Sequence, residues 1–168
     1  MEVDNLMLKK NARAAGWLYL LMGVTGAFGI MYVPSQIIVW DDAAATAQNV
    51  LTREMLFRLG ILSQLASQVF FIFLVLSLYR LLKGVNIRYA RQMAALVLTG
   101  VPVGFLNMVN QLAGLVLLSD AEFLKAIDPD QINVLVLVFF KLYEQGVTIV
   151  QVFWGLWLIP FGLLVYQS

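Results

Sequence analysis

Residues 57–82 read FRLGILSQLASQVFFIFLVLSLYRLL, a long and largely apolar stretch. A helix of about 20 apolar residues crosses a hydrocarbon core about 30 Å thick, so the stretch is long enough to span a membrane. Three further stretches of this kind occupy residues 14–38, 93–118 and 135–166. The sequence therefore predicts an all-α integral membrane protein, in which residues 1–168 form one four-helix transmembrane bundle.

Composition narrows the functional classes. Hydrophobic residues make up 61% of the chain and charged residues 12%, about half the charged fraction of a soluble domain. The chain has no cysteine and no histidine. This excludes disulfides, thiolate nucleophiles, Cys/His zinc sites, His-ligated haem and His-based acid–base catalysis. We therefore expect a protein that is not an enzyme and holds no cofactor. With a net charge of +1, no nucleic-acid partner is expected.

Basic residues gather on one side of the predicted helices. They lie before the first stretch and between the second and third, as Lys9, Lys10, Arg13, Arg80, Lys83, Arg88 and Arg91. Because positively charged loops remain in the cytoplasm, both termini are expected inside a bacterial inner (plasma) membrane and the two acidic loops outside. A cleaved signal peptide is the alternative for residues 14–38, but this stretch exceeds the roughly 7–15 apolar residues usual for such a segment.

Several residues indicate where helices begin and end. Asp41 or Asp42 suits an N-cap, so the first outer loop is expected to form a short amphipathic helix, and the second outer loop is expected to be similar. Thr52 is expected to cap the second long helix. The first long helix is expected to end near Pro34, because the residue before a proline resists the α conformation.

Prolines also indicate where the later helices begin or bend. Asp128 and Pro129 suit the N-cap and first position of the fourth long helix. Pro102 is expected to kink the third helix, and Pro160 to bend the end of the fourth. The four tryptophans are expected at two depths. Trp17, Trp40 and Trp157 are expected at the level of the lipid headgroups, and Trp154 is expected inside the bundle.

Polar side chains inside the apolar stretches form the candidate site. Eight are taken as ligand-binding candidates: Arg58, Gln64, Gln68, Asn107, Gln111, Lys141, Glu144 and Gln145. Spacings of three and four residues place the members from each helix on one face, and polar side chains in lipid prefer the bundle interior. Counting about 20 residues from each cytoplasmic end puts them nearer the outside. The sequence therefore predicts a polar pocket between the second, third and fourth helices, open to the outer face.

Three charged residues are expected to rim this pocket. Glu144 is the only acid inside the four stretches, Lys141 lies one turn away, and Arg58 could approach from the second helix. A lone charge costs on the order of 2.5–3.5 kcal/mol at a central position, so pairing is expected. A purely structural role is the alternative for the amides, since hydrogen bonds between membrane helices contribute about 0.6 kcal/mol each.

Three segments carry a family resemblance. They are residues 9–29, KKNARAAGWLYLLMGVTGAFG, residues 41–61, DDAAATAQNVLTREMLFRLGI, and residues 138–168, VFFKLYEQGVTIVQVFWGLWLIPFGLLVYQS. They resemble a bacterial family of multi-spanning membrane proteins known as domain of unknown function 4386. The resemblance implies location and architecture but no settled activity. The chain departs from the family pattern at Tyr143, where members usually carry a histidine, and at Ser168, after which members usually continue into about two further helices.

Two functions from different classes remain open. One is the binding or transport of a small polar or amphiphilic molecule in the pocket. The other is a non-catalytic accessory subunit that docks partner helices or a second copy. Membrane lipids are expected partners in either case. An intramembrane enzyme is disfavoured because the sequence shows no nucleophile–base pair and no paired carboxylates. A channel is disfavoured because no acidic stripe crosses the whole bilayer.

Overall fold

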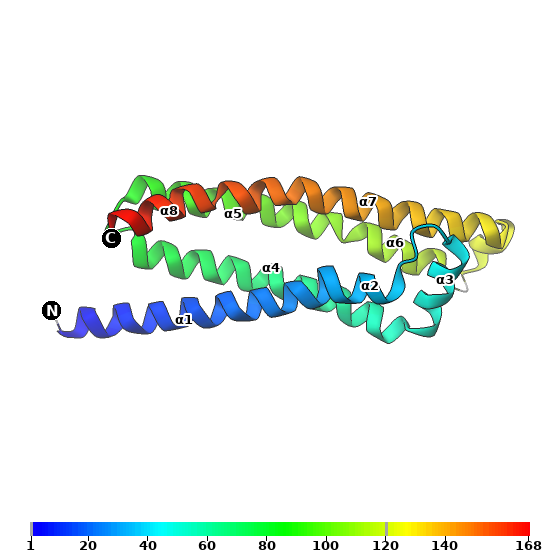
Figure 1. Cartoon of the computed structure of the whole chain (residues 1–168), viewed down its shortest axis with the longest axis horizontal. Helices are drawn as coiled ribbons and strands as arrows, with labels where there is room; N and C mark the ends of the chain where they lie inside the picture. The colour runs from blue at the N-terminus through cyan, green and yellow to red at the C-terminus, as the bar shows by residue number, and fades with distance from the viewer. Residues whose placement is uncertain (1, 120) are drawn as a thin grey trace.

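Four helical runs form the molecule, and each is long and apolar enough to cross a membrane: Lys9–Ile37, Glu54–Leu82, Ile87–Leu117 and Pro129–Gln167. They belong to a computed structural model that describes residues 2–119 and 121–168 (Figure 1). No strand occurs within these residues. The protein is therefore an all-α membrane protein with a four-helix bundle, as the apolar stretches predict.

The first run passes through Pro34 and ends shortly after it. Helix α1 (Glu2–Ala27) continues into a π-helical segment, η1 (Phe28–Tyr32), and then into α2 (Val33–Ile37). Pro34 lies just after the π-helical segment, and its missing N–H leaves a carbonyl group of the preceding turn without a helical donor. The run ends at Ile37, three residues after Pro34, so its end lies near the proline as expected, although Val33 keeps the α conformation.

Asp42 starts the short helix that follows. Its side chain accepts a hydrogen bond from the Ala45 backbone N–H at 2.8 Å, as the N-cap of α3 (Ala43–Thr52). This confirms the short helix predicted in the first loop. Thr52 does not cap α4 (Glu54–Leu82), because its hydroxyl donates to a carbonyl oxygen of its own helix at 2.8 Å. The capping role predicted for Thr52 is therefore wrong.

The third run is interrupted at Met108. Helix α5 (Ile87–Asn107) continues through Pro102, and α6 (Val109–Leu117) follows after the one intervening residue. A 3-10 segment, η2 (Glu122–Ala126), lies in the loop that leads to the fourth run. The break in the helix therefore lies beyond the proline that was expected to cause it.

The fourth run begins where the sequence predicts. The Asp128 side chain accepts a hydrogen bond from the backbone of α7 (Pro129–Leu156) at 2.9 Å. At Trp157 this helix gives way to α8 (Leu158–Gln167). Pro160 cannot donate a hydrogen bond to the carbonyl group one turn earlier, which explains an interruption at this point. The disturbance predicted at Pro160 is thus found at Trp157.

The helices form a curved row with α4 near its centre. Helix α4 packs against α1 and against α5, while α7 packs against α5, α6 and α3. Figure 1 shows α4 between α1 and the layer formed by α5 and α7. Both chain ends lie at the end of the bundle that holds the α4–α5 connection, which we call the terminal end. The opposite end holds α3 and is called the α3 end.

Two separate apolar cores hold the row together. The core near the terminal end contains Leu74, Leu78, Leu82, Ala90, Met93 and Leu164, among others. The core at the α3 end contains Val33, Ile37, Val50, Phe57, Ile61, Val136 and Phe140. Three buried polar side chains, those of Gln64, Gln68 and Gln111, lie between these two cores, and a fourth, Thr46, lies on α3.

Candidate functional site

Gln64, on α4, is the centre of a buried polar junction. Its amide nitrogen donates to the Gly29 carbonyl oxygen at 2.9 Å and to Gln111 Oε1 at 3.2 Å. Its amide oxygen accepts a hydrogen bond from the Tyr143 hydroxyl at 2.5 Å. The junction therefore connects η1, α4, α6 and α7. It confirms that Gln64 and Gln111 face each other inside the bundle.

Asn107 adds a second polar link, between α5 and α7. Its amide nitrogen donates to the Tyr143 carbonyl oxygen at 2.9 Å, and Asn110 Nδ2 donates to Asn107 Oδ1 at 3.2 Å. A Cβ atom at Gly146 would overlap the Asn107 amide, so this glycine lets the two helices approach closely. Asn107 therefore lies between helices, as its spacing from Gln111 predicts.

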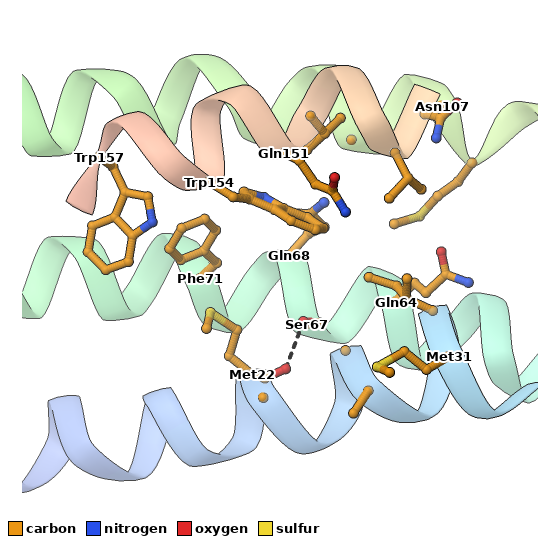
Figure 2. A pocket seen from close by; sticks show the side chains of 18 of the residues that line it. Met22, Met31, Gln64, Ser67, Gln68, Phe71, Asn107, Gln151, Trp154 and Trp157 are labelled. Atoms are coloured by element: carbon orange, nitrogen blue, oxygen red, sulfur yellow. Dashed lines mark hydrogen bonds between the residues drawn. The ribbon is translucent and has the colours of Figure 1, made fainter. Parts of the chain in front are cut away.

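A cleft of about 580 Å³ begins beside this junction and extends toward the terminal end. Its floor is formed by α4 and α5, one wall by α1 and η1, and the other wall by α7 and the start of α8 (Figure 2). Tyr19 and Met31 on the first wall are exposed, as are Gln151 and Leu158 on the second. The cleft therefore opens sideways between α1 and α7, through the long face of the bundle.

Contacts between α4 and the fourth run close the cleft toward both ends of the bundle. Toward the α3 end, the closing contact is the hydrogen bond between Tyr143 and Gln64. Toward the terminal end, the rings of Phe71 and Trp157 meet edge to face, with centroids 5.4 Å apart (Figure 2). Access from the aqueous phases at the two ends is therefore obstructed by packed side chains.

Gln68 lies on the floor of the cleft, one turn from Gln64. Its side chain is only 6% exposed, and its amide has no hydrogen-bond partner among residues 2–119 and 121–168. The amide nitrogen rests against Gly104, where a Cβ atom would overlap it. The Gln68 amide is not enclosed by protein, because it lines the cleft. A molecule in the cleft can therefore hydrogen bond to it.

The cleft lies at mid-length of the bundle. Gln68 is the central residue of α4, fourteen residues from each end. That separation is about 21 Å on either side, whereas half of a hydrocarbon core is about 15 Å. A membrane centred on α4 therefore surrounds the side opening with hydrocarbon. The cleft does not open toward the α3 end, because the hydrogen-bonded junction of Gln64, Gln111 and Tyr143 lies between the cleft and that end. That the α3 end faces outward stays a prediction.

The three charged candidates do not rim the cleft. Arg58 Nε donates to Glu54 Oε1 at 2.6 Å, one turn back on α4, and Arg58 is exposed. Lys141 Nζ lies 2.5 Å from Glu144 Oε2 and 4.7 Å from the centroid of the Trp40 ring. The pairing of Lys141 with Glu144 is confirmed. The expected approach of Arg58 is wrong, because Arg58 has an acidic partner on its own helix.

The rotation of α7 explains which of its polar residues reach the site. Gln145 is exposed and does not line the cleft, and neither do Lys141 and Glu144, whereas Gln151, further along α7, does. The lining face instead carries Tyr143, Val147, Val150, Trp154 and Trp157. Their spacing of four, three, four and three residues is a helical pattern that marks the inward face of α7. The polar residues on the other face of the helix made this pattern difficult to recognise in the sequence. Trp157 is buried, so its predicted place at headgroup level is wrong.

Comparison with known families defines the relationship of the chain. The model of a family described as a domain of unknown function (DUF4386) matches residues 14–168. The chain belongs to the DUF4386 family. The resemblance seen in the sequence is thereby confirmed, and every residue of the cleft lies within the DUF4386 match. No curated protein and no solved structure matches this DUF4386 chain.

Proposed function

We propose that the protein binds a membrane-dissolved amphiphile that enters the cleft from the side. The observation that supports this most strongly is Gln68, a buried amide at mid-length of the bundle that faces the cleft without a hydrogen-bond partner among the described residues. Small-molecule sites usually measure roughly 300–1,000 Å³, and the cleft, at about 580 Å³, falls in this range. The apolar part of the ligand extends between α1 and α7 into lipid.

The other sequence candidates receive different roles in this proposal. Gln64, Asn107 and Gln111 hold the helices in place, because their amides are already hydrogen bonded within the junction. Exposed ion pairs contribute about 0–1 kcal/mol, so the pairs made by Arg58 and Lys141 are surface features. The groups at the cleft are amides, hydroxyls and aromatic rings, which favours binding without catalysis.

The proposed orientation follows from charge. At the terminal end, Lys83 lies in the α4–α5 connection and Arg88 and Arg91 lie in the first turns of α5, and both chain termini lie at that end (Figure 1). Because positive loops remain in the cytoplasm, we place the terminal end inside the cell and the α3 end outside a plasma membrane. Under this orientation the cleft serves molecules that move within the bilayer and not those dissolved on either side.

Native mass spectrometry tests the proposal directly. The full chain, released in mild detergent from the membranes in which it was expressed, is expected to carry an added mass of one small lipid-soluble molecule. Gln68→Leu is expected to lose that added mass, because leucine keeps the bulk but cannot hydrogen bond. A loss of one hydrogen bond of about 1.4 kcal/mol lowers affinity roughly tenfold.

Two matched variants serve as controls for this measurement. Gln145→Leu makes the same chemical change on an exposed position outside the cleft, and Glu144→Gln removes the surface ion pair. Both are expected to retain the added mass at the wild-type level. Equal retention by Gln68→Leu, or loss in Glu144→Gln alone, would contradict the proposed site.

A second function, an accessory subunit, is favoured by the sparse packing of α1. This helix packs mainly against α4, and its outward face exposes Trp17, Leu20 and Val24. A partner helix from another protein or a second copy would cover this face. A discrete complex of higher mass in the same experiment, with no small-molecule adduct, would support this function over ligand binding.

A further inference from the structure

The hydrogen-bonding groups that line the cleft without a partner among the described residues include the amides of Gln68 and Gln151, which donate and accept, and indole N–H groups, which only donate. Ser67 and Asn107 already have hydrogen-bond partners. The Ser67 hydroxyl donates to the Met22 carbonyl oxygen at 2.9 Å, and the Asn107 amide donates to the Tyr143 carbonyl oxygen. The indole N–H of Trp157 makes no hydrogen bond to the described residues, although its side chain is only 4% exposed. An indole N–H can only donate. The cleft therefore favours a ligand that presents acceptor atoms.

Donors lie along the cleft on both sides of Phe71. Figure 2 shows the ring nitrogen of Trp157 on the side of its indole that faces Phe71, and Gln68 lies three residues before Phe71 on α4. The two donors therefore lie apart from each other along the cleft. A ligand with two separated acceptor oxygens can engage both of them, whereas one with a single polar end engages only one.

The absence of charge at the cleft restricts the ligand further. Among the described residues, those lining the cleft include no Asp, Glu, Lys or Arg. A carboxylate or phosphate placed at this depth would be desolvated without a counter-charge, which is strongly unfavourable. Ionised fatty acids and the headgroups of anionic phospholipids are therefore disfavoured on electrostatic grounds.

Aromatic side chains determine the shape of the ligand. Phe71, Trp154 and Trp157 all line the cleft, and Figure 2 shows the Trp154 indole lying across it between Gln151 and Gln68. Aromatic rings pack favourably against planar groups in offset or edge-to-face arrangements. Met22 and Met31 complete the lining on the α1 side and adapt to irregular apolar shapes.

We infer that the ligand is an uncharged lipid with a planar ring bearing two carbonyl oxygens, that is, a lipid-soluble quinone. Its carbonyl oxygens accept hydrogen bonds from Gln68 and Trp157, its ring packs against Trp154 and Phe71, and its tail leaves through the side opening. This inference rests on the proposed function, since it assigns a chemical class to the same cleft. Neutral lipids with ester carbonyls share the acceptor chemistry but lack the ring.

The test compares three probes on the purified full-length protein in detergent. They are decylubiquinone, 1,2-dioctanoylglycerol and decanoate, and the readout is the temperature of aggregation followed by light scattering. Decylubiquinone is expected to raise this temperature in a saturable manner. Gln68→Leu and Trp157→Phe are each expected to need roughly tenfold more quinone for the same effect. Trp157→Phe keeps an aromatic ring but removes the indole donor together with part of the ring volume, and Gln145→Leu is expected to respond as wild type.

The outcomes separate this inference from the proposed function. Saturable stabilisation by dioctanoylglycerol or decanoate but not by decylubiquinone would overturn the quinone assignment and leave the binding cleft intact. A response to quinone that is unchanged in both Gln68→Leu and Trp157→Phe would overturn the assignment of the donors. No saturable response to any probe, together with no small-molecule adduct in native mass spectrometry, would overturn both.

Discussion

Replacement of Gly29 by alanine is expected to destabilise the bundle by about 2–3 kcal/mol, because an added methyl group in a packed interface forces the helices apart. A Cβ atom at Gly29 would lie 2.7 Å from the Gly60 carbonyl oxygen and 3.2 Å from the Gln64 backbone nitrogen. These are backbone atoms and cannot rotate away. Separation of η1 from α4 would also break the hydrogen bond from Gln64 to the Gly29 carbonyl oxygen. The free energy of unfolding in an SDS titration measures the effect.

Gly16→Ala is the matched control for this prediction. Gly16 lies on α1, and a Cβ atom there would meet nothing within 4 Å. Alanine in a helix is favoured over glycine by up to about 1 kcal/mol, so this variant is expected to be equal to or slightly more stable than wild type. A loss in Gly29→Ala no larger than the change in Gly16→Ala would show that η1 and α4 do not pack as closely as described.

Replacement of Gln64 by leucine is expected to cost about 2 kcal/mol of stability, since three interhelical hydrogen bonds are lost at about 0.6 kcal/mol each. The bonds join Gln64 to Tyr143, Gly29 and Gln111. Gln68→Leu makes the same chemical change one turn away, where no hydrogen bond to the described residues is present. In ligand-free detergent, Gln68→Leu is therefore expected to unfold at nearly the wild-type SDS concentration.

The two glutamine variants thus separate structure from binding. Gln64→Leu is expected to lose stability, and Gln68→Leu to lose the bound molecule. A double-mutant cycle with Tyr143→Phe adds a direct check, because this change is expected to cost stability in wild type but almost nothing in the Gln64→Leu background. Additive effects of the two substitutions would show that Tyr143 and Gln64 are not hydrogen bonded to each other.

Much of the fold could be predicted because the signals are local. Apolar stretches of sufficient length define the four runs, and the caps at Asp42 and Asp128 follow from residue type and position. The three-and-four spacing also placed Gln64 and Gln111 correctly in the interior. In each of these cases one residue or one helix face decides the outcome without reference to the rest of the bundle.

The cleft itself could not be predicted because it depends on how far apart two helices lie. Helix α7 carries two competing faces, one with Lys141 and Gln145 and one with Tyr143 and Trp154, and the sequence does not show which face packs inward. The packing of α7 against α5 decides which face points inward, because Gly146 contacts the Asn107 side chain and this contact fixes the rotation of α7. The hydroxyl of Tyr143 was missed because tyrosine counts as an apolar residue in a hydropathy pattern.

Fluorescence quenching of Trp154 by lipids brominated at defined depths tests the central claim, a cleft at mid-depth that opens to the bilayer. The protein would carry Trp154 alone, with Trp17, Trp40 and Trp157 replaced by phenylalanine, and a Trp17-only variant as the comparison. We predict that bromines deep in the acyl chains quench Trp154 most strongly. Strongest quenching of Trp154 by a water-soluble quencher, or by bromines near the headgroups, would contradict a cleft open to the hydrocarbon core.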